Sequence, residues 1–488
     1  MRNNKNILYI FLILLPFFSI GRNHDTIYVS YDSEVDKFFR VSSEKAMEEG
    51  ILSKEYKVKK KARISFGNQA CKGTVRLKGD WTDHLKKDKW SLRVELDSGS
   101  IYKIRKFSLQ FPETRGGVNE ALFHRVLKQE NVLTTEYKFI HLVVNNVYWG
   151  LFAFEEHPDK NMLTNNGMPQ GVLLKFNEEG FWECQRDIIK HGENKCYEYP
   201  IFEASKILPF NKKSTYGDTL KMNQFLLARR KLSQWQDGKI DVKDVNVDSF
   251  AKYYALCDVF EMYHGLQWHN QRFYFNPSSN TIEPVAYDCF SEDHQLIGKD
   301  FLGQFDGHYD SVYFQEQWFN YQLYQDSIFV SKYYKYLDIY SIKEWDFSVW
   351  SFFDDEVQLV HDRLGKRKEK IAIFLKKEQD TPQLYLYEDW KRDNPDKIKK
   401  YDTPFSDLPF FNVSLRAVIK NGKIEAKNFH LSEIEIIGVG NEKIVEVPFE
   451  SIFIKPRGVV LIDFQDKSFL YFKSNEKVFK TKIELENL

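Results

Sequence analysis

The sequence predicts an α+β protein in which two lobes precede a separate β-rich domain, and three observations indicate this fold class. Residues 59–110 contain four segments of alternating apolar and polar residues separated by Gly, Asp and Lys turns, which is typical of an antiparallel sheet. Residues 314–377 show helical periodicity with many Tyr, Trp and Phe, and such aromatic stripes mostly form cores. From residue 410 onward, short apolar runs recur about every ten residues, which predicts a small β-sandwich-like domain.

Size and charge limit the function classes. The chain has 488 residues, 42% hydrophobic and 16% aromatic, which is ample for two or three domains with packed cores. Its 70 Lys and Arg balance its 70 Asp and Glu, so no overall field attracts nucleic acid or an anionic membrane. We therefore expect a globular protein that does not bind nucleic acid.

The N-terminus has the pattern of an export signal. Arg2 and Lys5 precede the apolar run Ile7–Ile20, and Ser19 and Gly21 are small residues where a signal peptidase reads. This run is shorter than the roughly 20 residues that a membrane span needs, although an uncleaved N-terminal anchor stays open as an alternative. We predict a signal peptide at residues 1–21 and export to a periplasm, cell envelope or extracellular space, with membrane contact only if the segment is uncleaved.

The first lobe is expected at residues 59–176, after an N-terminal extension at 22–58. In the extension, residues 26–32 read as a strand, and a short helix begins at Ser42 or Ser43 and ends at Gly50. The lobe itself has the four strands, a helix at residues 118–132 and a hairpin whose turn is Asn145-Asn146.

Residues 177–247 are expected to form an insertion or lid, and residues 248–395 a helical lobe. In an exported chain, Cys184 and Cys196 are able to bridge the polar loop between them, which would be worth about 3 kcal/mol. Asp248 is the expected N-cap of a helix that Gly265 ends, and a hairpin built around the turn NPSSN follows. A linker then leads to the β-rich domain at residues 400–488.

Asn270 and Asp288 flank this second hairpin. An amide oxygen and a carboxylate are hard ligands that are able to share the divalent metal bridging nucleotide phosphates, so their order suits a nucleotide-dependent phosphoryl transferase. The alternative is structural, with Asn270 capping a turn and Asp288 ending a strand.

Several segments together resemble the CotH (spore coat protein H) kinase family over roughly residues 60–300. They occur in the order RLKGDW, DKWSLRV, VNEALFHRVL, NNVYWGLFAFEEH, GVLLKF, HNQRFYFNP and PVAYD. The resemblance implies an atypical, minimal protein-kinase-like fold of two lobes. It also implies binding of ATP with Mg²⁺ or Mn²⁺ and phosphorylation of Ser or Thr in a protein or envelope substrate.

In such a fold, a lysine of the sheet neutralises phosphate oxygens and a glutamate holds that lysine. Lys89 is the first choice for the lysine because it begins a strand, Lys175 is its rival and Lys78 comes third. Glu156 occupies the end of the strand GLFAFEE where the family pattern places the glutamate, and alternation turns Glu155 to the other side of the sheet.

The loop HGLQWHN departs from the family pattern, in which many members carry an Asp before the metal-binding Asn. His264 is able to accept a proton at neutral pH and is the expected substitute base, with Asp258 on the preceding helix as the alternative. This departure leaves open a pseudokinase or assembly protein of the envelope without catalysis. The many aromatic residues suggest a further hypothesis, a sugar-binding or sugar-modifying protein. The latter lacks an acid pair in a context typical of glycoside chemistry.

Overall fold

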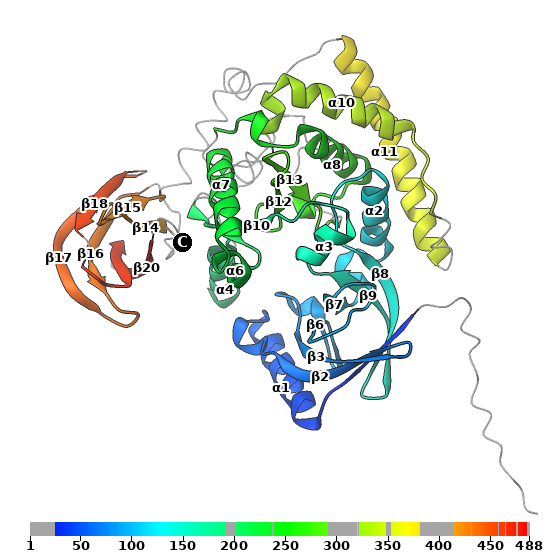
Figure 1. Ribbon diagram of the computed structural model, residues 1–488, viewed down its shortest axis with the longest axis horizontal. Coiled ribbons are helices and arrows are strands. Elements are labelled where there is room, and N and C mark those ends of the chain that lie inside the picture. Colours follow the sequence, from blue (N-terminus) through cyan, green and yellow to red (C-terminus); the bar gives the residue numbers. More distant parts are fainter. Residues whose placement is uncertain are drawn as a thin grey trace, which may run out of the picture.

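The structure is a computed structural model with a barrel, a helical region and a C-terminal sheet (Figure 1). It describes residues 25–191, 202, 204–236, 239–290, 320, 322–347, 353–380 and 414–485, except residues 431, 457, 464, 475 and 476. The predicted signal peptide, Cys196 and the predicted linker lie outside the described residues. The α+β fold class is confirmed. None of the described helices has both the length and the apolar character that crossing a bilayer requires.

Seven strands close into a barrel in the order β1-β2-β3-β6-β7-β9-β8. The four strands expected in the first lobe are all present within this barrel, and β1, from the predicted extension, closes it. β1 pairs antiparallel with β2 and parallel with β8. The strand bounds are β1 Thr26–Ser30, β2 Lys60–Phe66, β3 Gln69–Leu77, β6 Leu92–Leu96, β7 Lys106–Gln110, β8 Tyr137–Val144 and β9 Val147–Glu156.

Local turn chemistry shapes the barrel ends. Asn145 and Asn146 adopt φ values of 47° and 65° at the β8–β9 turn, which confirms the predicted hairpin. Helix α1 (Ser33–Glu49) ends at Gly50 as predicted, but it begins nine residues before Ser42, because Asp32 caps it by accepting from the Val35 N–H. The remaining short elements are η1 Lys54–Tyr56, η2 Thr82–His84, β4 Leu85–Lys86, β5 Lys89–Trp90 and η3 Pro112–Arg115.

A four-stranded sheet in the order β11-β10-β12-β13 lies in the helical region. Its bounds are β10 Val172–Phe176, β11 Ile207–Pro209, β12 Arg272–Asn276 and β13 Thr281–Val285. The β12–β13 hairpin is confirmed. β10 was expected with the first lobe, but it pairs with β12, with Leu174 opposite Phe273, because its side chains join the helical core rather than the barrel core.

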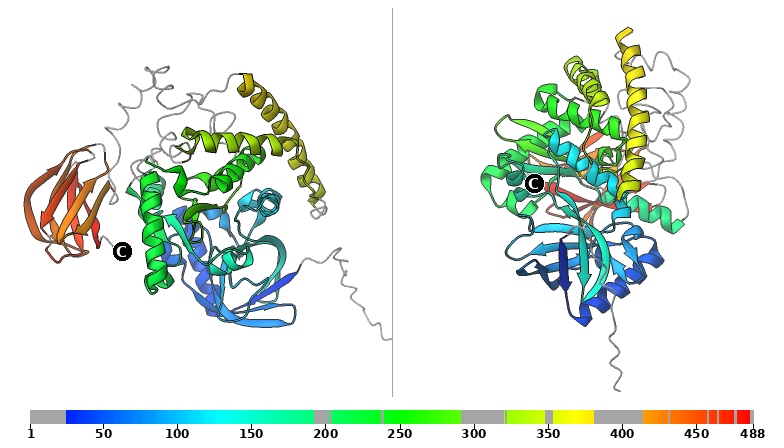
Figure 2. Two further views of the ribbon diagram at one scale, coloured as in Figure 1. Left: turned by 45° about the horizontal axis from the view of Figure 1, so that its top comes forward. Right: turned by 90° about the vertical axis from the view of Figure 1, so that its right-hand side faces the viewer.

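Helices surround this sheet, and the views in Figure 2 show α10 and α11 outside α8. Helix α8 is buried along almost its whole length. It begins after the N-cap Asn246 rather than Asp248, and it ends at Phe260 with Glu261 (φ 56°) as its C-cap rather than at Gly265. The bounds are α2 Val118–Gln129, α3 Lys160–Asn165, α4 Glu179–His191, α6 Lys212–Tyr216, α7 Thr219–Gln236, η4 Val242–Asp244, α8 Val247–Phe260, η5 His264–Leu266, η6 Gln322–Gln325, α10 Ser327–Ile342 and α11 Asp354–Asp380.

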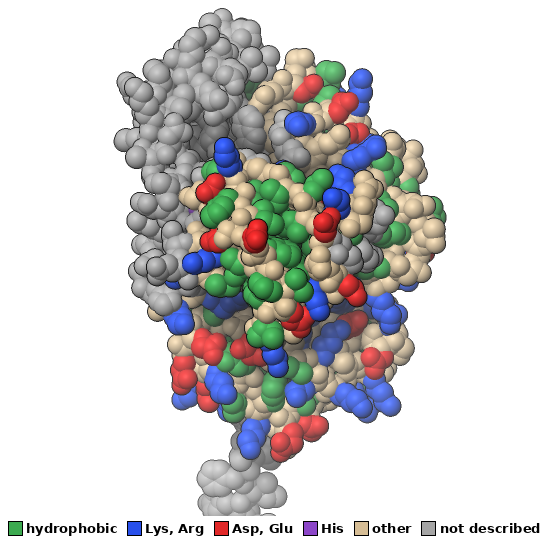
Figure 3. Space-filling view, turned by 90° about the vertical axis from the view of Figure 1, so that its left-hand side faces the viewer, with side chains coloured by type: hydrophobic (Ala, Val, Ile, Leu, Met, Phe, Trp, Pro, Cys, Tyr) green, Lys and Arg blue, Asp and Glu red, His purple; other side chains and the backbone are tan. Residues whose placement is uncertain are grey.

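The C-terminal domain is one sheet rather than the expected sandwich. Its order is β17-β16-β19-β20-β14-β15-β18, and it curls into a nearly closed barrel around a single core. The parallel pairing of β14 with β20 joins what would otherwise be two sheets. The bounds are β14 Leu415–Lys420, β15 Lys423–Asn428, β16 Ile434–Gly440, β17 Val445–Ile454, β18 Val459–Asp463, β19 Phe469–Ser474 and β20 Lys477–Leu485. Figure 3 shows hydrophobic side chains gathered on the end of the molecule where this domain lies.

Candidate active site

A strongly basic pocket of about 530 Å³ is lined by both the barrel and the helical region. Among the described lining residues, four are Asp or Glu and ten are Lys or Arg: Lys54, Lys57, Arg76, Lys78, Arg93, Arg115, Lys175, Arg186, Lys212 and Arg272. The volume is within the range of small-molecule sites, and the excess of positive charge favours a polyanionic ligand. The neutral whole-chain charge therefore conceals a local positive field.

A buried amine and its acidic anchor lie in the barrel wall of this pocket. Lys78 directly follows β3, and its Nζ lies 3.6 Å from Oε2 of Glu155 on β9 and donates to Oε1 of Gln110. Burial lowers the pKa of Lys78 to about 8, against the opposing effect of the Glu155 carboxylate. Both carboxylate oxygens of Glu155 are buried without a hydrogen-bond partner, so Lys78 is the cation that compensates this acid.

Asp288 pairs with Arg115 in the same pocket. The Arg115 Nε lies 2.9 Å from Oδ1 of Asp288 and 3.6 Å from Oε2 of Glu120 on α2. Burial alone would raise the pKa of Asp288, but Arg115 and then His264 outweigh it and lower that pKa, so the carboxylate is ionised at neutral pH. Glu120 also accepts from the Cys289 N–H at 2.9 Å, so α2 fixes the backbone beside Asp288, whose φ is 58°.

The loop before β12 places Asn270 and His264 beside Asp288. The Asn270 Nδ2 donates to the carbonyl of His264 at 3.1 Å, which leaves the amide oxygen as the atom able to bind a ligand. His264 Nε2 lies 3.9 Å from Oδ1 of Asp288. All three residues line the pocket.

The oxygens of Asp288 and Asn270 fit a divalent cation that is shared with a nucleotide. The described residues contain no group of three or more His, Cys, Asp or Glu side chains able to hold a metal alone. Mg²⁺ in nucleotide sites is usually held by one or two protein oxygens together with phosphate oxygens and water. The donor set therefore suits a cation that arrives with phosphates rather than a permanent metal centre.

Lys175 also lines the pocket, but a different acid holds it. Its Nζ lies 2.8 Å from Oε1 of Glu178, and Arg272 Nη2 lies 3.0 Å from the same oxygen. Burial would raise the pKa of Glu178, yet Arg272 and Lys175 lower it to about 2. Glu178 thus keeps two cations at the pocket wall.

Three residues predicted from the sequence do not reach the pocket. Lys89 lies in the two-residue strand β5 and donates from Nζ to the carbonyl of Trp149 at 2.7 Å. Glu156 points to the opposite side of β9 from Glu155 and accepts from the Glu136 N–H at 3.0 Å.

Asp258 faces the helical core, where it accepts from the hydroxyls of Tyr263 and Tyr333 at 2.9 and 2.6 Å. The expected pairing of Glu156 with Lys89 or Lys175 is therefore replaced by the pair Lys78–Glu155. Glu155 and Glu156 point to opposite sides of β9, as alternation predicts. The glutamate that faces Lys78 is Glu155, not the expected Glu156.

Sequence reasoning missed Arg115 and Glu120 entirely. Glu120 lies within the apolar helix 118–132, where a carboxylate four residues before His124 falls on the same helix face. A charged residue on a face that packs into the core was the available signal for a buried ionic network. Arg115 lies in a short 3-10 turn whose sequence, PETR, carries no such signal.

Comparisons with known proteins give one positive result. A family model described as CotH kinase protein matches residues 75–340, which is more than half of the chain and includes Lys78, Glu155, Asn270 and Asp288. No curated protein matches the chain. The resemblance identified from the motifs is thereby confirmed.

Proposed function

Because the chain belongs to the CotH kinase protein family, we propose that it transfers the γ-phosphoryl group of ATP to a hydroxyl of a protein or envelope component outside the cytoplasm. Family membership implies kinase activity and binding of ATP. The observation that carries the proposal is the convergence of Lys78, Asn270 and Asp288 around one basic pocket of about 530 Å³, with Glu155 paired to Lys78. The predicted signal at residues 1–21 supports the location outside the cytoplasm.

Each residue has a role that follows from its position. Lys78, held by Glu155, neutralises phosphate oxygens, and the remaining Lys and Arg of the pocket add to the field that attracts the triphosphate. Asp288 and Asn270 would hold Mg²⁺ or Mn²⁺, which would supply charge neutralisation to the phosphates. Arg115 keeps Asp288 ionised, and Glu120 holds the backbone beside it through the Cys289 N–H.

The acceptor hydroxyl requires a base, and His264 is the residue we assign to this role. The hydroxyl oxygen bonds to the γ-phosphorus while the bond between that phosphorus and the β–γ bridging oxygen breaks. ADP leaves, and the hydroxyl proton passes to the imidazole. His269 is the poorer base, because burial and then His264 lower its pKa to about 3, and it stacks on Phe181 with ring centroids 4.0 Å apart.

The activity is tested with the purified full chain, Mn²⁺ or Mg²⁺ and ATP labelled in the γ-phosphate, with the chain itself and dephosphorylated casein as acceptors. We expect label incorporation that falls by about 10²-fold or more in Lys78→Met and in Asp288→Asn. Lys89→Met is the matched control, because this lysine lies outside the pocket, and it should keep its activity. A wild-type protein that binds no ATP in calorimetry at millimolar concentration would overturn the proposal.

A non-catalytic nucleotide-binding protein is the second candidate. It is favoured by one observation: the loop from His264 to Asn270 contains no carboxylate. ATP binding that persists in wild type without any phosphoryl transfer, together with loss of that binding in Lys78→Met, would select this alternative.

A further inference from the structure

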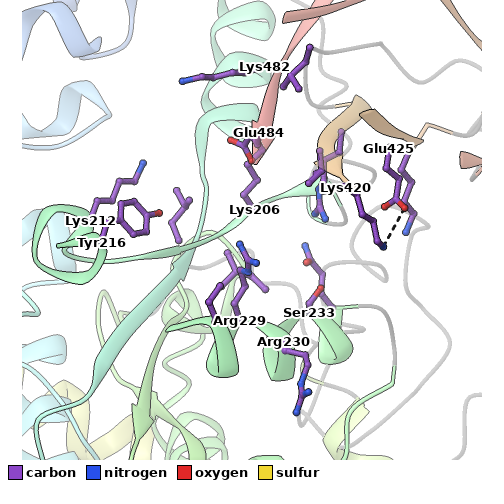
Figure 4. Close-up of a pocket in the computed structure, with 18 residues that line it drawn as sticks. Lys206, Lys212, Tyr216, Arg229, Arg230, Ser233, Lys420, Glu425, Lys482 and Glu484 are labelled. Carbon is purple, nitrogen blue, oxygen red and sulfur yellow. Dashed lines mark hydrogen bonds and ion pairs between the residues drawn. The ribbon is translucent and has the colours of Figure 1, made fainter. Parts of the chain in front are cut away.

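A second basic crevice, of about 1020 Å³, separates the helical region from the C-terminal sheet. Figure 4 shows Lys212 and Tyr216 of α6, Arg229, Arg230 and Ser233 of α7, and Lys420, Glu425, Lys482 and Glu484 of the C-terminal strands around this space. The two sides are joined by an ion pair of 2.5 Å between Lys206 Nζ and Glu484 Oε1. The crevice is thus a defined gap between two packed bodies.

The lining of the crevice is strongly cationic. Among the described lining residues there are eight Lys or Arg and only two Glu. Glu484 pairs with Lys206, and Glu425 lies 3.5 Å from Lys420. The other cations of the lining are Lys212, Arg229, Arg230, Arg416, Lys427 and Lys482.

Two of these cations lie directly opposite each other. Arg416 on β14 is the cross-strand partner of Lys427 on β15. Their charged groups lie 5.0 and 4.7 Å from the ring of the same residue, Phe429. Like charges directly opposed across a sheet repel each other, and an anionic ligand between the two bodies would reduce that repulsion.

Apolar side chains alternate with the charges and indicate what kind of anion fits. The lining includes Ile207, Leu208, Leu226, Val418 and Ile483. A uniformly charged polymer would gain nothing from these residues and would meet the two glutamates. A polypeptide with acidic and apolar side chains is able to use both kinds of surface.

The crevice is adjacent to the nucleotide pocket. Leu208 at the end of the sheet and Lys212 on α6 line both spaces. A chain bound in the crevice therefore has a short path along β11 and α6 to the pocket that contains Lys78 and Asp288. The volume also exceeds what one small molecule needs.

We propose that this crevice docks an acidic peptide segment of the phosphate acceptor and so presents a neighbouring Ser or Thr hydroxyl to the nucleotide pocket. The inference rests on the proposed kinase function and adds the substrate class to it. Its first test needs no catalysis.

The binding test uses fluorescence anisotropy of the full chain with a fluorescein-labelled peptide in which a run of Glu and Leu precedes one Ser, in the absence of ATP. Wild type should bind it with an affinity that falls as salt is raised. The variant Arg230→Glu/Lys427→Glu/Lys482→Glu should bind roughly tenfold more weakly or worse. None of these three cations has an ion-pair partner among the described residues, so their replacement should leave the fold intact.

The matched control is Lys37→Glu/Lys45→Glu/Lys87→Glu, which makes the same charge change at three exposed lysines on the barrel side. It should bind the peptide as wild type does. Equal binding by Arg230→Glu/Lys427→Glu/Lys482→Glu, the crevice variant, and by the control would overturn the inference. So would displacement by heparin without binding of the acidic peptide, which would assign the crevice to an anionic polysaccharide instead.

Kinetics separate the docking inference from the proposed function. In the crevice variant, KM for the acidic peptide should rise about tenfold while kcat and KM for ATP stay unchanged. Peptide binding without any phosphoryl transfer would support docking and overturn the kinase. Transfer to the peptide with an unchanged KM in the crevice variant would support the kinase and overturn docking.

Discussion

Replacing Glu155 by Gln should take the charge from Lys78 at neutral pH. In the wild type, burial lowers the pKa of Lys78 to about 8, and Glu155 is the largest influence that keeps it from falling further. The Lys78 Nζ and Glu155 Oε2 are 3.6 Å apart, and both side chains are almost wholly excluded from solvent. Glutamine keeps the shape of the side chain and removes only the charge.

The expected size of the effect follows from Coulomb's law. Two unit charges 3.6 Å apart interact by about 5 kcal/mol at an effective dielectric constant of about 20. Since about 1.4 kcal/mol changes a pKa by one, this loss is enough to move the pKa of Lys78 to below about 7. At pH 7.5 the variant then presents a largely neutral amine to the phosphates, and we expect ATP to bind about tenfold more weakly.

Calorimetric titration with ATP between pH 6 and pH 9 tests whether Glu155→Gln lowers the pKa of Lys78. Affinity in the wild type should fall as the pH rises through about 8. In Glu155→Gln the fall should occur at a lower pH, so the difference from wild type shrinks as the solution is acidified. Glu156→Gln is the matched control, because its carboxylate lies on the other side of β9. If Glu155→Gln and wild type lost affinity at the same pH, Glu155 would not set the charge of Lys78.

Four other substitutions, one of them a control, test separate parts of the structure. Gly79→Ala should lower the free energy of unfolding by about 2 kcal/mol or more in thermal denaturation, because φ is 101° and the new Cβ would lie 2.0 Å from Cδ2 of His84. Gly67→Ala, with open space around it at φ 53°, should cost about 1 kcal/mol, and equal losses would refute the steric argument. Asp258→Asn should destabilise the protein by about 3–5 kcal/mol in urea, because it removes the buried carboxylate that lies 3.6 Å from the buried Arg367 guanidinium. Selective loss of turnover in a fully folded Asp258→Asn variant would instead indicate that Asp258 takes part in catalysis. The carboxylate of Glu178 should contribute about 3 kcal/mol that is present above pH 4.5 and lost as the pH falls toward about 2. A stability difference between wild type and Glu178→Gln that did not shrink on acidification would contradict that shifted pKa.

Elements with a local signal were predictable. The Asn145-Asn146 turn and the β12–β13 hairpin depend on residues within a few positions of each other, and both are confirmed. The early start of α1 also had a signal, since Val35, Phe39 and Ala46 follow helical spacing after Asp32.

The amine and its anchor could not be chosen from the sequence because both faces of the end of β9 are buried. Alternation states that Glu155 and Glu156 point in opposite directions, but residues 152–156 are all buried, so hydrophobicity does not mark the inner face. The choice depends on how the barrel closes. Asn270 and Asp288, by contrast, flank a single hairpin, and a local pattern was sufficient to place them together.

Closure of the barrel also has a consequence for biogenesis. β1 is the first of the described strands to be synthesised, yet its parallel partner β8 follows far later, with Thr26 opposite His141. Until β8 has been made, the ring stays open, with unsatisfied hydrogen-bonding edges that invite association with other chains. Recombinant versions that begin after Ser30 would carry that open ring permanently and should aggregate, whereas those that begin at or before Asp25 should yield monodisperse material.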